Sequence, residues 1–81
     1  MSETSIRELI TGLFGRKPIL ADITADQDFF EVGVSSLTIL DLQIQIEQAL
    51  SVSVPTSELM RHATLNGWIA AYVQAEASVA A

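Results

Sequence analysis

Residues 28–37 read DFFEVGVSSL, and this stretch decides the fold because it joins a glycine-containing turn to a strongly helical segment. Gly33 gives the backbone the freedom to turn just before that segment. Ser35 and Ser36 then stand where a helix should begin, and serine is a preferred residue type at such a position. A serine hydroxyl at a helix start faces solvent, where another enzyme could modify it. No other part of the chain offers a comparable chemical handle.

Length, charge and composition limit the kind of protein that this can be. Eighty-one residues predict one domain over 1–81, with an ordered core over about 4–74 and a frayed tail over 75–81. The net charge of −6 argues against binding to nucleic acid, and the absence of cysteine excludes thiolate metal sites. The chain shows neither the pattern of a secretion signal nor an apolar run that could span a membrane. We therefore expect a cytoplasmic monomer without a metal site.

Apolar periodicity, cap residues and helix breakers predict an all-α fold of three main helices and one short helix. The predicted helices cover about 4–15, 36–50, 56–61 and 64–77. Thr4 or Ser5 is expected to cap the first helix, and Thr64 the last. The long connection over 16–35 should contain a short helical turn at 28–31. Six apolar residues should anchor this connection to the core: Ile19, Leu20, Ile23, Phe29, Phe30 and Val32.

The second predicted helix has two apolar faces, although a surface helix of a small bundle needs only one. At about 100° per residue, one face gathers Ile39, Leu42, Ile46 and Leu50. The opposite face gathers Leu37, Leu40 and Ile44, here called the apolar ridge, beside Asp41 and Glu47. We expect the first face to lie in the core and the apolar ridge to be an exposed docking surface. The alternative is that the helix lies centrally in the bundle and both faces are buried.

Several of these features together resemble the acyl and peptidyl carrier proteins. The pattern is FFEVGxxSL over 29–37, followed by Pro55 and by Thr64 at the start of the last helix, and the resemblance covers roughly 5–74. It implies a four-helix carrier bundle in which Ser36 bears 4′-phosphopantetheine, attached from coenzyme A by a phosphopantetheinyl transferase. The thiol of that arm holds acyl or aminoacyl groups as thioesters, so the carrier itself is not an enzyme. Without the resemblance, Ser36 is simply a helix N-cap.

The chain departs from the family pattern at Ser35, where an aspartate or histidine usually precedes the modified serine. Ser35 is therefore a second candidate for attachment, and its presence bears on which transferase acts. Six residues are the predicted docking residues: Leu37, Leu40, Asp41, Ile44, Glu47 and Arg61. Asp41 and Glu47 stand among glutamines, so partner choice should depend mainly on the apolar ridge, with charge steering the approach.

This weakly charged helix resembles that of discrete carriers in polyketide pathways, including macrolactam assembly, or in nonribosomal peptide pathways. The resemblance implies that the partners are an acyltransferase, an adenylation or ligase enzyme, or a ketosynthase. Two alternatives remain open from the residues alone. One is a helical adaptor that docks through the apolar ridge without a prosthetic group, and the other is a small hydrolase that uses Ser36, although no base is placed beside it.

Overall fold

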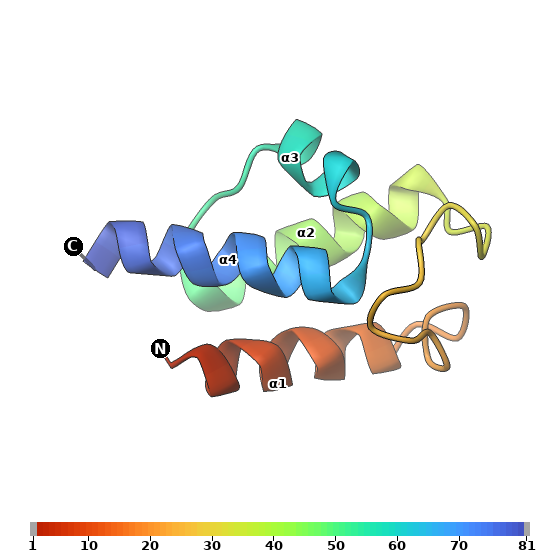
Figure 1. Ribbon diagram of the computed structural model, residues 1–81, viewed down its shortest axis with the longest axis horizontal. Coiled ribbons are helices and arrows are strands. Elements are labelled where there is room, and N and C mark those ends of the chain that lie inside the picture. The colour runs from red at the N-terminus through yellow and green to blue at the C-terminus, as the bar shows by residue number, and fades with distance from the viewer. Residues whose placement is uncertain (1, 81) are drawn as a thin grey trace.

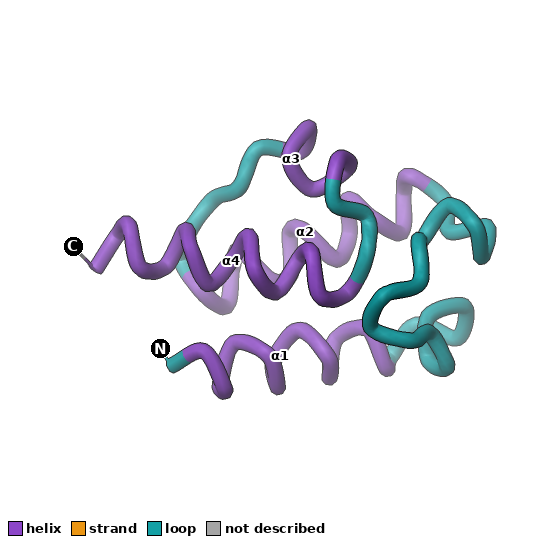
Figure 2. The backbone as a smooth tube through the Cα atoms, in the orientation of Figure 1, coloured by secondary structure: helices purple, strands orange, loops and turns teal. Residues whose placement is uncertain are grey.

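The computed structural model describes the backbone of residues 2–80 and the side chains of residues 2–78. It contains four helices, which are α1 (Glu3–Gly15), α2 (Ser36–Leu50), α3 (Thr56–Arg61) and α4 (Leu65–Ala80), as Figure 1 shows. Throughout the described residues the remaining segments are turns and loops, without strands (Figure 2). The expected all-α fold of three main helices and one short helix is therefore confirmed.

The three long helices pack side by side, and the long connection lies at one end of them. α1 packs against both α2 and α4, and α3 packs against α4. α2 and α4 begin at the end of the bundle where α1 finishes (Figure 1). The connection over 16–35 occupies this same end (Figure 2). The start of α2, which carries the two candidate serines, therefore lies at the end of the bundle where the loops gather.

A cluster of buried aromatic rings joins α1, the connection and α4. The Trp68 ring lies 5.7 Å from the ring of Phe14 and 5.4 Å from that of Phe29, both in edge-on orientation. Such edge-to-face pairs add about 0.5–1.5 kcal/mol to the stabilisation from burial. The Trp68 indole also donates a 3.0 Å hydrogen bond to the Leu59 carbonyl, which ties α3 to α4. Trp68, which the sequence places on the apolar stripe of its helix, is thus a central core residue.

Hydrogen bonds hold the connection against the α3–α4 turn. The Phe29 amide donates to the Ala63 carbonyl at 2.8 Å, and the Asn66 amide donates to the Ala25 carbonyl at 3.0 Å. The Asn66 side chain also donates to Asp26 Oδ1 at 2.9 Å. These hydrogen bonds join loop and helix-start residues, and they fix the connection over 16–35, which has little regular structure of its own.

The predicted anchors of the connection are correct for four residues and wrong for two. Leu20 and Phe29 are buried, while Ile23 and Val32 pack partly buried against the core. Ile19 and Phe30 are instead exposed. Each is the chain neighbour of a buried anchor, and the turns direct consecutive side chains to different sides. Only one residue of each pair therefore reaches the core.

The ends of α1 and α4 differ from prediction. Ser2, rather than Thr4 or Ser5, caps α1, and its hydroxyl accepts a 3.1 Å hydrogen bond from the Ser5 amide. Thr64 caps α4 as predicted, with the Gly67 amide donating to Thr64 Oγ1 at 2.9 Å.

α4 runs to Ala80, beyond the predicted end at 77 and through most of the tail expected to fray. Its last turns are rich in alanine, the residue with the highest helix propensity, and this accounts for the extension. Residues 1 and 81, which the predicted domain includes, lie outside the described residues. None of the helices in the described part of the chain is long and apolar enough to cross a membrane.

Candidate functional site

A tight turn leads the chain into α2. The Asp28 carboxylate accepts a 2.7 Å hydrogen bond from the Phe30 amide, and the Asp28 carbonyl accepts one from the Glu31 amide at 3.1 Å. Gly33 has a φ of +82°, a conformation that residues with a side chain rarely adopt. The segment predicted as a helical turn at 28–31 is thus a hydrogen-bonded turn without helix. It is anchored by Phe29 in the core and sets the direction in which α2 begins.

The two adjacent serines have different roles at the start of α2. Ser35 is the N-cap, with extended backbone angles, and its hydroxyl accepts a 3.3 Å hydrogen bond from the Thr38 amide. The Ser35 and Thr38 hydroxyls lie 3.1 Å apart and also share a hydrogen bond. The sequence on its own predicted Ser36 as the helix N-cap, but Ser36 is the first residue inside the helix. The cap lies one residue earlier, because the backbone leaves its extended conformation after Ser35.

The Ser36 side chain is exposed, and within the described part of the chain no group forms a hydrogen bond with its hydroxyl. The first turn of α2 contains no acidic residue. The amino end of a helix carries a partial positive charge, which favours an anionic group. An attached phosphate would therefore meet favourable electrostatics at Ser36. The residues present fit a phosphate-linked prosthetic group at this position.

The two apolar faces of α2 have opposite environments, as predicted. Ile39, Leu42, Ile46 and Leu50 are buried. In the apolar ridge, Leu37 is 80% exposed, Leu40 40% and Ile44 55%. The alternative of a central helix buried on both faces is therefore excluded.

Asp41 lies beside the apolar ridge, and side chains of the same protein compensate its negative charge. Its carboxylate forms an ion pair with the Lys17 ammonium group, which comes from the connection, and accepts a 2.9 Å hydrogen bond from Gln45. The Lys17 and Gln45 hydrogen bonds hold the pKa of the Asp41 carboxyl below its ordinary value. Lys17 did not emerge as a site residue from the sequence, because it is 24 positions away from Asp41 and belongs to no motif.

Glu47 lies at the border of the exposed face and is only partly exposed. Its carboxylate oxygen Oε2 accepts hydrogen bonds from the Tyr72 hydroxyl at 3.0 Å, the Val54 amide at 3.1 Å and the Gln43 amide group at 3.3 Å. Burial and the neighbouring Glu47 carboxylate raise the pKa of Tyr72, so the phenol remains a donor. Glu47 joins α2 to α4 and to the segment before α3, so its carboxylate has a structural task, and its docking role stays a prediction.

Arg61, the remaining predicted docking residue, ends α3 and is exposed. Its guanidinium lies 3.8 Å from the Glu58 carboxylate, and His62 Nε2 lies 3.6 Å from the same side chain. An exposed pair of this kind contributes about 0–1 kcal/mol. Its docking role stays a prediction.

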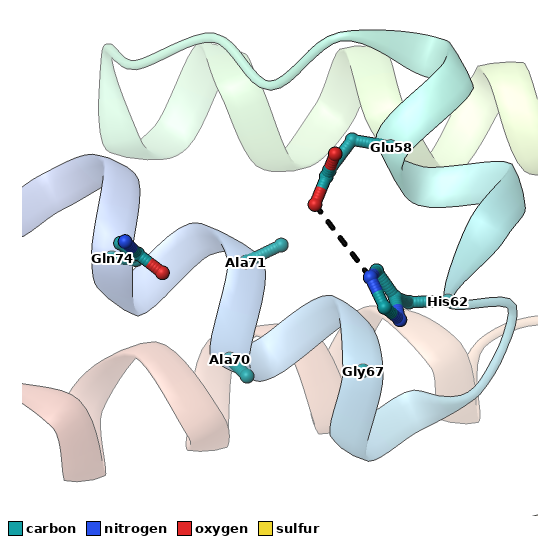
Figure 3. A pocket seen from close by; sticks show the side chains of 6 residues that line it. All are labelled: Glu58, His62, Gly67, Ala70, Ala71 and Gln74. Carbon is teal, nitrogen blue, oxygen red and sulfur yellow. Dashed lines mark ion pairs between the residues drawn. The ribbon is translucent and has the colours of Figure 1, made fainter.

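A shallow cavity of about 160 Å³ lies between α3 and α4 (Figure 3). It is lined by Glu58, His62, Gly67, Ala70, Ala71 and Gln74. No α2 residue contributes to it, so it is separate from the serine and the apolar ridge. The described residues also contain no group of three or more histidine, aspartate or glutamate side chains that could hold a metal ion.

A four-helix bundle that presents an unengaged serine at the start of its second helix has the architecture expected of a carrier protein. The family model described as the phosphopantetheine attachment site matches residues 4–72, and the chain belongs to this family. Comparisons with curated proteins and with solved structures found no significant match.

Membership of the family defines the general role of the chain. It is a carrier that holds 4′-phosphopantetheine covalently and is not itself an enzyme. The family works with phosphopantetheinyl transferases and with biosynthetic enzymes in general. Neither the adaptor without a prosthetic group nor the small hydrolase agrees with this role.

Proposed function

We propose that Ser36 is the residue that carries 4′-phosphopantetheine and that the chain is a discrete acyl or aminoacyl carrier. The observation that carries this proposal is the contrast between the two serines. Both serines are exposed, but the Ser35 hydroxyl is engaged in capping α2, whereas the Ser36 hydroxyl has no hydrogen-bond partner in the described part of the chain. Ser36 also stands directly before Leu37 and three residues after Gly33, which is the spacing of the family pattern.

Each part of the site has a physical task in this proposal. The Ser36 oxygen becomes the ester oxygen of the phosphate, and the amino end of α2 stabilises the phosphate charge. The bound arm supplies a thiol that holds the cargo as a thioester. The apolar ridge lies on the same helix as Ser36, so a partner enzyme that docks on it has its reactive site near the arm. The chemical steps on the cargo belong to that partner.

Ser35 stands where the family usually has aspartate or histidine, and it caps the helix as an aspartate would. Serine and aspartate are both strong N-cap residues, so the helix start keeps its geometry. The substitution removes one negative charge beside the attachment point. A transferase that acts on this chain therefore meets a neutral residue before Ser36, and this favours enzymes that do not depend on a carboxylate there.

We place the carrier in a polyketide pathway, including macrolactam assembly, or in a nonribosomal peptide pathway. The support is the weakly charged second helix, whose two carboxylates are both used within the protein. Its partners would be a phosphopantetheinyl transferase and an acyltransferase, an adenylation or ligase enzyme, or a ketosynthase. The cysteine-free composition suits the reducing cytoplasm, where we expect the chain to act as a monomeric single domain.

Co-expression with a broad-specificity phosphopantetheinyl transferase, followed by intact-mass measurement, tests the attachment residue. The wild-type chain and Ser35→Ala should each gain the mass of one phosphopantetheinyl group. Ser36→Ala should gain none. Ser35→Ala is the matched control because it removes the neighbouring hydroxyl and leaves Ser36. A gain of mass in Ser36→Ala, or an unmodified wild-type chain, would overturn the proposal.

A further inference from the structure

One charged residue, Asp41, lies beside the apolar ridge, and the protein neutralises that charge with its own Lys17. Asp41 lies one turn after Leu37 and three residues before Ile44, so it shares their side of α2. Its side chain is about half exposed, with 47% of its surface accessible, and its carboxylate is paired with Lys17. The only other carboxylate of α2, that of Glu47, is committed to hydrogen bonds within the fold.

We propose that Lys17 determines partner specificity: by neutralising Asp41, it makes the apolar ridge dock as an uncharged surface. The partner that fits this surface is an enzyme whose docking site is apolar and brings no cation against Asp41. This inference rests on the proposed function, because it concerns the enzymes that act at Ser36.

The position of Asp41 explains why compensation matters for docking. A partner that covers Leu37, Leu40 and Ile44 also comes against the Asp41 carboxylate at the edge of this surface. Removing an unpaired carboxylate from water is strongly unfavourable, whereas a carboxylate that is already paired and hydrogen-bonded loses much less. An aspartate is ionised at neutral pH, and pairing with Lys17 lowers the pKa of Asp41 further, so the charge is compensated rather than removed by protonation.

The other cations of the described chain are not available for this task. Arg7 donates to the Asn66 side chain at 3.3 Å, and Arg61 pairs with Glu58 on α3. Arg16 is exposed and forms no ion pair within the described residues. Lys17 alone joins the connection to the exposed side of α2. Arg16, its chain neighbour, provides the matched control, because its loss changes the net charge equally and leaves Asp41 paired.

The test measures the kinetics with which a broad-specificity phosphopantetheinyl transferase modifies the full chain from coenzyme A. Lys17→Met should raise KM for the carrier about two- to fivefold relative to Arg16→Met, the range expected for an exposed charge pair. The value of kcat and the melting temperature should stay the same, because the change affects docking. Adding Asp41→Asn to Lys17→Met should bring KM back to within about twofold of the Arg16→Met value, since the two positions are coupled.

Two outcomes would overturn the inference. A lower KM for Lys17→Met would mean that the partner brings its own cation to Asp41. Equal KM values for Lys17→Met and Arg16→Met would mean that net charge alone matters. In both cases Ser36 would still be modified, so the proposed function would stand. If the wild-type chain is not modified at all, the proposed function itself fails.

Discussion

The two apolar faces of α2 are chemically alike and have opposite environments. Ile46 is fully buried, whereas Ile44, two positions earlier on the same helix, is 55% exposed. The difference comes from the number of helices available to cover α2, because only one of its faces meets the rest of the bundle. Side-chain hydrophobicity therefore does not distinguish the core from the exposed surface in so small a protein. The distinction is made by which neighbour each face meets.

The largest expected effect comes from comparing the same substitution on the two faces. Ile46→Ala should lower the free energy of unfolding by about 2–5 kcal/mol, because it leaves a cavity in the core. Ile44→Ala should change it by less than about 0.5 kcal/mol, since the side chain is already in contact with water. Urea denaturation of the two variants measures both values. Equal losses of stability would show that the apolar ridge also belongs to the core, so the two faces of α2 would not differ.

The sequence predicted this division because the helix wheel separates the two sets of residues, and because few other helices exist to cover both. It could not predict the partners of charged residues that are distant along the chain. Lys17 reaches Asp41, and Tyr72 reaches Glu47, only after the helices pack. The predicted cap residues of α1 and α2 were wrong, because neighbouring serines and threonines are all competent caps. The backbone angles at the entry decide which of them acts.

Glu47 lies at the border between the two faces and gives the next largest effect. Glu47→Ala should destabilise the fold by about 1–3 kcal/mol, because the Tyr72 hydroxyl and the Val54 amide each lose their acceptor. Gln48→Ala, at the exposed neighbouring position, should cost less than about 0.5 kcal/mol. Thermal unfolding followed by circular dichroism compares them. If Glu47→Ala were as stable as the control, the hydrogen bonds that Glu47 accepts would not contribute to the stability of the fold.

A cation placed on the exposed face tests its docking role directly. Ile44→Arg should raise KM for the phosphopantetheinyl transferase by about tenfold, the loss expected when one apolar anchor of an interface is removed. Its melting temperature should remain close to that of the wild-type chain. Thr11→Arg adds the same charge to an exposed position of α1 and should leave KM nearly unchanged. An unaltered KM for Ile44→Arg would show that the apolar ridge does not take part in binding the transferase.

The smallest effect concerns the start of α2, where two adjacent exposed serines differ in that only Ser35 caps the helix. Ser35→Ala removes the cap of the Thr38 amide and should lower the free energy of unfolding by about 1 kcal/mol. Ser36→Ala should change it by less than about 0.5 kcal/mol, since alanine is tolerated inside a helix and no described hydrogen bond is lost. Denaturation of the two unmodified proteins separates these values. The reverse ranking would make Ser36 the capping serine and would leave Ser35 with the unengaged hydroxyl, which would move the proposed attachment site to Ser35.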